Sequence, residues 1–138
     1  MSVSEATVRA LADQVADLVK AWIPQTTVGV RIEPYPGGGR DMAGVLNSAW
    51  TVYFDIGSDR SDSVAVWVPQ DEDSSFVLFR LVDALDEISE TGPHRGEAFP
   101  RCVAGHSHPA EIRVDGGGVV FLCAKTGEIS NRIPLPGG

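Results

Sequence analysis

Basic residues are scarce in this chain, and long apolar runs are missing. Among its 138 residues, 11 Lys and Arg stand against 19 Asp and Glu, so the formal net charge is −8 at pH 7. Nucleic acids and anionic membranes both attract basic surfaces, so we expect neither as a partner. No run of about 18 apolar residues is present, so no transmembrane helix is expected. Glu5, Asp13 and Asp17 interrupt the N-terminal apolar positions where a signal peptide needs an unbroken stretch, and the expected location is the cytoplasm.

Cysteine is also scarce, with only Cys102 and Cys123 in the chain. Cytoplasmic thiols stay reduced, so this pair is expected as thiols or metal ligands rather than as a disulfide. A chain of this length buries about two-thirds of its unfolded surface and needs no disulfide to form a core. We predict a single domain over residues 1–138, with an α-β-β-β-α core over 4–92 and a Cys/His loop and C-terminal hairpin over 93–133.

Apolar residues recur at helical spacing in residues 4–22 and 74–89. Apolar and polar residues alternate in three shorter stretches, residues 28–32, 50–56 and 64–68, a pattern typical of half-buried strands. Residues 111–114 and 119–123 flank the glycines at 116–118, which suggests another hairpin. The resulting order is α-β-β-β-α-β-β. It predicts an α+β fold in which one antiparallel sheet carries two helices on one face.

The chemically informative residues are Cys102, His106, His108 and Cys123. Thiolate and neutral imidazole are the ligands that zinc prefers, and four of them complete a tetrahedron. Side chains two apart on an extended segment point to the same side, which pairs the two histidines. A turn centred near residue 117 places Cys123 beside His108. The sequence therefore predicts a structural zinc site, against the alternatives of two core cysteines with two surface histidines, or of a disulfide.

The string His106-Ser107-His108-Pro109 resembles the His-Ser/Thr-His-Pro segment of the JAMM metalloproteases, in which two histidines bind catalytic zinc. That family continues with Ser-x-x-Asp, whereas residues 116–120 here are Gly-Gly-Gly-Val-Val. We interpret the similarity as incidental. The alternative function that it implies is a small zinc-dependent hydrolase, in which three ligands leave an open position for water. Glu111, Asp115 or Glu128 would then serve as the base, and the spacing selects none of them.

A second candidate site lies on the predicted strands. A turn centred near residue 60 pairs Tyr53 with Trp67 on the face away from the main core, and Arg31 and Asp55 fall on the same face. Two interpretations remain open. The last hairpin or the 34–48 loop covers this pair, or the pair belongs to a partner-binding patch, because exposed aromatics are enriched at interfaces.

The order of elements over residues 4–123 resembles the type III secretion chaperone-like fold, including bacterial relatives outside secretion systems. The resemblance is one of topology. It implies a protein that binds peptide segments of its partners, often as a dimer. We therefore expect a non-enzymatic protein- or peptide-binding domain, chaperone-like or immunity-like, with zinc as a structural cofactor. The expected partner is another protein or peptide, with a homodimer as a further option.

Overall fold

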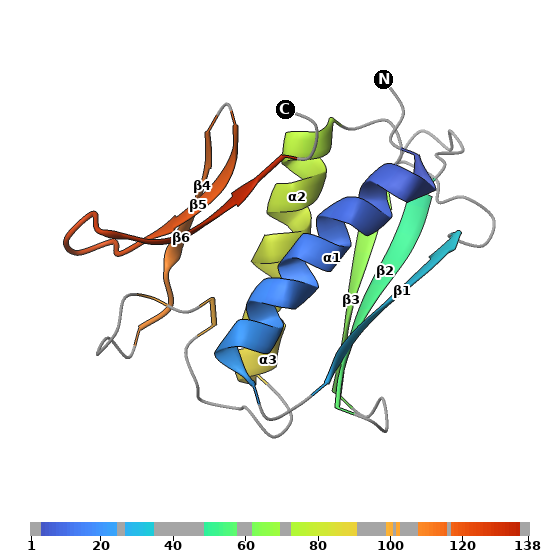
Figure 1. The fold of residues 1–138 in the computed structure, drawn as a ribbon, viewed down its shortest axis with the longest axis horizontal. Helices are drawn as coiled ribbons and strands as arrows, with labels where there is room; N and C mark the ends of the chain where they lie inside the picture. Colours follow the sequence, from blue (N-terminus) through green and yellow to red (C-terminus); the bar gives the residue numbers. More distant parts are fainter. Residues whose placement is uncertain are drawn as a thin grey trace, which may run out of the picture.

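A computed structural model gives the fold (Figure 1). It describes residues 4–24, 27–34, 49–57, 62–69, 73–90, 99–100, 102, 108–115 and 117–135. Within these ranges the chain is α+β, and the predicted order α-β-β-β-α-β-β is confirmed, with one further strand at its end. None of the described helices is long and apolar enough to cross a membrane.

The first helix, α1, runs over Glu5–Trp22. Ser4 caps it, because its hydroxyl accepts a hydrogen bond from the backbone N–H of Thr7 at 3.2 Å. One side of the helix is fully buried, as its apolar spacing predicts. The buried residues of this stripe are Val8, Leu11, Ala12, Val15, Ala16 and Val19.

The second helical segment begins with α2, Ser74–Asp83. The carboxylate of its N-cap, Asp73, accepts from the backbone N–H of Phe76 at 2.8 Å. A 3₁₀ turn, η1 over Ala84–Asp86, then leads into the short helix α3, Glu87–Glu90. The single helix predicted over 74–89 is therefore present, with a tightened turn in its second half.

The first sheet contains β1 (Val28–Pro34), β2 (Ala49–Ile56) and β3 (Asp62–Pro69), in the antiparallel order β1-β2-β3. Helix α1 contacts β1 and β2, and α2 contacts β3, so both helices lie on one face of this sheet. The side chains of Val52 and Phe54 point toward the helices and are fully buried.

The C-terminal strands form a second antiparallel sheet instead of extending the first. This sheet has the order β4-β5-β6, with β4 over Glu111–Asp115, β5 over Gly118–Leu122 and β6 over Ile129–Pro134. The sequence pattern predicted one sheet and no β6. The reason for two sheets is visible in α2, which contacts β3 on one side and β4 and β5 on the other.

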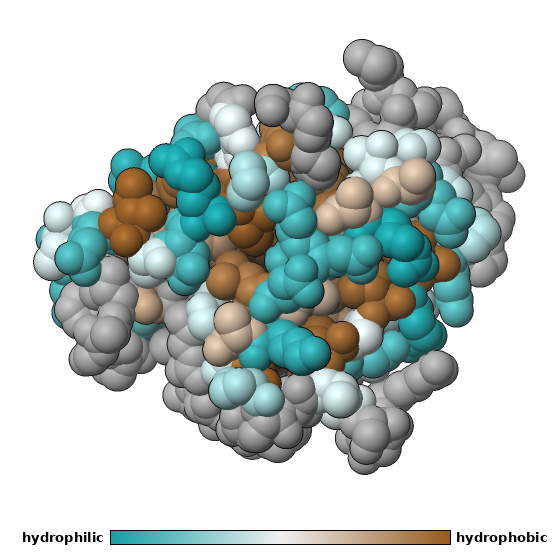
Figure 2. All heavy atoms as spheres, in the orientation of Figure 1, coloured by the Kyte–Doolittle hydropathy of each residue, from teal (hydrophilic) through white to brown (hydrophobic). Residues whose placement is uncertain are grey.

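The two helices are therefore an inner layer between the two sheets (Figure 1). A single hydrophobic cluster passes through all three layers. It includes Val52 and Phe54 from the first sheet, Leu78 and Leu81 from α2, and Phe121 from the second sheet. Figure 2 shows that, on the face in view, apolar residues reach the surface in several separate patches among hydrophilic ones.

Candidate metal centre and open sheet face

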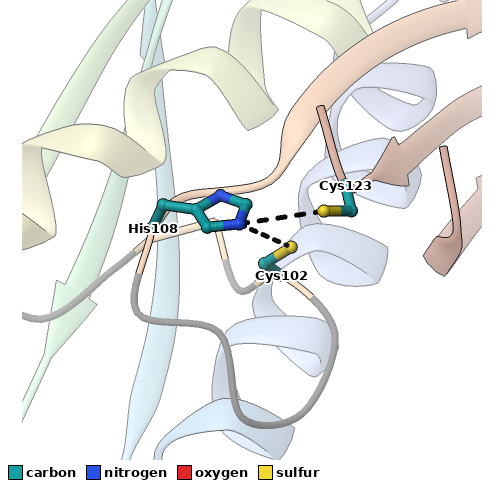
Figure 3. Close-up of side chains that lie close together, drawn as sticks. All are labelled: Cys102, His108 and Cys123. Atoms are coloured by element: carbon teal, nitrogen blue, oxygen red, sulfur yellow. Dashed lines mark hydrogen bonds between the residues drawn. The ribbon is translucent and has the colours of Figure 1, made fainter. Parts of the chain in front are cut away.

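Three predicted ligands, Cys102, His108 and Cys123, converge at one end of the second sheet. The Nε2 atom of His108 lies 3.9 Å from the Sγ of Cys102 and 3.7 Å from the Sγ of Cys123. All three ligand atoms lie within 4.8 Å of one another, so the group can hold a metal ion. Figure 3 shows both sulfurs facing the same ring nitrogen.

The β4–β5 hairpin brings His108 and Cys123 together. Glu111 pairs with Leu122 in its ladder, so the next position outward pairs Ala110 with Cys123. The prediction that a turn near residue 117 returns Cys123 beside His108 is therefore confirmed. The backbone N–H of Ala110 also donates to the Pro100 carbonyl at 2.9 Å, which holds the segment of Cys102 against the base of the hairpin.

Cys123 begins a tight turn that favours its thiolate. Its side chain is fully buried, and the backbone N–H of Gly127 donates to its carbonyl at 2.7 Å. The pKa of the Cys123 thiol is lowered to about 6, and the largest cause is the hydrogen bond with the hydroxyl of Thr126. The backbone N–H groups of Thr126 and Lys125 act in the same direction, and burial opposes them. The thiolate is the form of cysteine that binds metal ions.

A backbone carbonyl orients His108. Its Nδ1 lies 3.0 Å from the carbonyl oxygen of Pro109. A proton on Nδ1 donates to that oxygen and leaves the lone pair of Nε2 facing the two sulfurs. Metal-binding histidines are commonly fixed in this way by a carbonyl or a carboxylate on the other ring nitrogen.

The fourth predicted ligand, His106, lies outside the described residues, so the structure places three of the four. Two of the three carboxylates considered as bases, Glu111 and Asp115, have other contacts. Glu111 accepts from Arg113 at 3.2 Å, and Asp115 accepts from Arg132 and from the backbone N–H of Gly117.

An aromatic cluster of Trp22, Phe99 and Phe121 lies close in sequence to the two cysteines, and no sequence pattern indicated this cluster. Trp22, at the end of α1, meets the ring of Phe121 edge-on with centroids 5.8 Å apart. The same indole lies 6.0 Å from the ring of Phe99. Phe121 precedes Cys123 by two residues, and Phe99 precedes Cys102 by three. Nothing in the sequence pattern links Trp22 to these two rings, because the contact depends on how the helix and the second sheet pack.

The second candidate site lies on the face of the first sheet that points away from the helices. The guanidinium of Arg31 donates to both carboxylate oxygens of Asp55, at 2.6 Å from Nε and 3.0 Å from Nη2. It also lies 4.3 Å from the centre of the Tyr53 ring. Ser63 donates to Asp55 at 2.6 Å. These contacts leave Asp55 only 7% exposed, although no helix covers it.

The expected pairing of Tyr53 with Trp67 is wrong by two residues along β3. Tyr53 pairs with Ala65, and Trp67 pairs with Thr51. The turn between β2 and β3 is centred one residue earlier than expected, which moves each partner by two residues. Tyr53 and Trp67 therefore remain on the same face as diagonal neighbours.

The second sheet does not cover this face, because it lies on the other side of the helices (Figure 1). One of the two coverings considered from the sequence, the last hairpin, is therefore wrong. The 34–48 loop lies outside the described residues apart from Pro34. Trp67 is 36% exposed and is one of four exposed large apolar residues in the described part of the chain.

Comparison with protein-family models, with curated proteins and with solved structures finds no match to this chain.

Proposed function

We propose that this chain is a non-enzymatic protein- or peptide-binding domain, chaperone-like or immunity-like, whose second sheet is fastened by a structural zinc ion. The observation that carries the proposal is the convergence of Cys102, His108 and Cys123 at one end of the second sheet. His106, only two residues before His108, is the fourth ligand that we assign.

The distances in the group fit zinc. Zinc binds thiolate sulfur at about 2.3 Å and imidazole nitrogen at about 2.0 to 2.1 Å in a tetrahedron, so a sulfur and a nitrogen on one ion lie about 3.6 Å apart. The two sulfur–nitrogen distances here are 3.7 and 3.9 Å. Two sulfur ligands also favour zinc over magnesium and calcium, which take oxygen ligands.

Four protein ligands leave no open position for water, so the ion acts on structure rather than on a substrate. Cys102 belongs to the segment after the helices, whereas Cys123 directly follows β5. An ion between them ties that segment to the hairpin at the end where the ladder stops.

The open face of the first sheet supports the binding role. It presents Trp67 and the Arg31–Tyr53 stack, side chains of the kind that contribute most at protein interfaces. The ion pair with Asp55 holds Arg31 in place, so the face loses little side-chain entropy on binding. A partner that lays an extended or aromatic segment across the strands would fit it.

Metal analysis tests the zinc site. Protein purified without a histidine tag or added zinc is expected to contain one zinc per chain by mass spectrometry, with both thiols protected from titration. His108→Ala and His106→Ala should each lower the zinc content. The third histidine, His94, is the matched control, and His94→Ala should retain the ion. Metal-free protein with two freely reactive thiols would remove the site.

Peptide selection tests the binding face. The purified chain is used to select from a displayed library of random peptides, and the selected peptides are then measured against variants. Trp67→Ala is expected to lose at least tenfold in affinity. Phe76→Ala removes another exposed aromatic from α2, away from this face, and should bind as the wild type does. Equal binding by a folded Trp67→Ala protein would refute the role of this face.

A further inference from the structure

The free edge of the first sheet at β1 carries a further inference. At one end of the β1–β2 ladder, the backbone N–H of Gly57 donates to the carbonyl of Thr27 at 2.9 Å, and these positions continue the register of the two strands. Hydrogen-bonded positions alternate along an antiparallel strand, so the odd-numbered residues of β1 bond to β2. The N–H and carbonyl groups of Val28, Val30 and Ile32 therefore point outward.

The opposite edge of the same sheet is protected. Arg80 of α2 donates to the outward carbonyl of Trp67 from Nε at 3.2 Å and from Nη2 at 2.9 Å. Proteins protect edge strands with charged side chains, prolines and bulges. The register of β1 is continuous, without a bulge, and its proline is the last residue, Pro34. Its two charged side chains, Arg31 and Glu33, are within ion-pair distance of each other, and Arg31 also pairs with Asp55 of the neighbouring strand. Within the described ranges, no hydrogen bond reaches the outward groups of β1.

The side chains along β1 are also incompletely covered. Val28, Val30 and Ile32 face the core but are only half-buried. An open hollow of about 380 Å³ at this edge is lined by Gly29 and by the paired side chains of Arg31 and Asp55, among others. A strand added to this edge would therefore bury apolar side chains on one face and fill the hollow.

We propose that β1 pairs antiparallel with β1 of a second copy of this chain, about a two-fold axis beside Val30. Val30 then faces Val30 of the second copy, and Val28 faces Ile32 in both directions. Each of these three pairs exchanges two hydrogen bonds, because all three positions point outward. The two sheets join into one sheet of six strands.

Two-fold symmetry also fits Gly29 and Arg31, the residues that lie between these positions in β1. It places Arg31 of the second copy opposite Gly29, which has no side chain. A Cβ added at Gly29 meets nothing within 4 Å, so there is room for the arginine. The guanidinium then lies over Gly29, in the hollow beside the ion pair that Asp55 forms with Arg31 of its own chain. An unrelated peptide would have to bring a long side chain to this position, whereas β1 carries one at the required spacing.

Molar mass in solution tests the pairing without reference to zinc or to a peptide partner, so its failure leaves the proposed function untouched. Light scattering across a dilution series is expected to approach twice the chain mass of 14.7 kDa. Val30→Pro removes an outward N–H and no bond to β2, so the variant should keep its circular dichroism spectrum and fall to the single-chain mass. Val30→Ala keeps the N–H and is the matched control, which should remain a dimer.

Charge at position 29 provides a second test. Gly29→Arg would confront Arg31 of the second copy and should give a monomer, whereas Gly29→Glu should keep the dimer. Within one chain, position 29 pairs with Asp55, so an arginine there should be tolerated. A single-chain mass for Gly29→Arg with an unchanged circular dichroism spectrum therefore reports the loss of the dimer and not a loss of folding. A single-chain mass for the wild type at every concentration, or a dimer that survives Val30→Pro, would overturn the proposal.

Discussion

Phe121→Leu should weaken metal binding from a position that no metal ion touches. Phe121 is fully buried on β5, two residues before Cys123, and its ring meets Trp22 of α1 edge-on. Leucine keeps most of the apolar volume but cannot reproduce this contact. The hairpin that positions Cys123 then loses part of its attachment to the helix layer.

The magnitude follows from two contributions. Exchanging one buried apolar side chain for another of similar volume costs up to about 1.5 kcal/mol. The aromatic contact adds about 0.5 to 1.5 kcal/mol, so the free energy of unfolding should fall by about 0.5 to 3 kcal/mol. Phe54→Leu is the matched control. Phe54 is equally buried, lies in the first sheet and has no such ring contact within the described residues. It should lose only the first contribution.

Two measurements separate the effects. Urea unfolding gives the free energy of each variant, and competition with a chromophoric chelator gives the zinc affinity of the folded protein. Phe121→Leu should lower both, whereas Phe54→Leu should lower the stability and leave the zinc affinity unchanged. The reasoning is refuted if both variants bind zinc as the wild type does, or if Phe54→Leu loses as much affinity as Phe121→Leu.

Three further predictions concern the helix cap, a close backbone contact and the metal. The pKa of Asp73 is lowered by the backbone N–H of Phe76 and by Ser75, so the cap stabilises the fold above its ordinary pKa of 3.8 and is lost at lower pH. The difference in Tm between wild type and Asp73→Ala should therefore be largest near neutral pH and shrink below about pH 4. Gly118→Ala should cost about 2 to 4 kcal/mol in urea unfolding, because a Cβ there collides with the carbonyl of Ile133 and the φ angle is +152°. An unchanged midpoint would contradict that contact. Chelation of zinc should speed hydrogen exchange in β5 and β6 and leave β2 unchanged, and equal acceleration in both sheets would argue against a local fastening role.

Local patterns in the sequence predicted the elements well. The apolar spacing of α1 and α2 and the alternation in β1 to β3 are properties of short segments, and the structure confirms these elements. The glycines at 116–118 in the sequence also predicted the centre of the β4–β5 hairpin, and the observed register agrees with it. The predicted register placed Cys123 next to His108.

Longer-range features were not predictable in the same way. The turn between β2 and β3 has no tight-turn signal, so its centre was misplaced by one residue and Tyr53 was given the wrong partner. Strand β6 was missed because Ile129 and Ile133 are separated by three polar residues, and its second half ends at a proline. The division into two sheets depends on α2 burying apolar residues on two sides, and periodicity in one helix does not identify what lies on each side.

The metal group and the small size of the second sheet are connected. Each of its strands has only five or six residues, and only one of its faces reaches the common core. Small sheets of this kind need support beyond their own ladder. At one end of β5, Gly118 lets β6 approach closely enough for a direct backbone contact. At the other end, Cys123 directly follows β5, and its backbone N–H donates to the Glu128 carbonyl at 2.8 Å in the turn before β6. The proposed zinc ion would add an attachment from this end of the hairpin to the separate segment that carries Cys102, which is why we assign the Cys/His group to the structure of the domain and the partner to its other sheet.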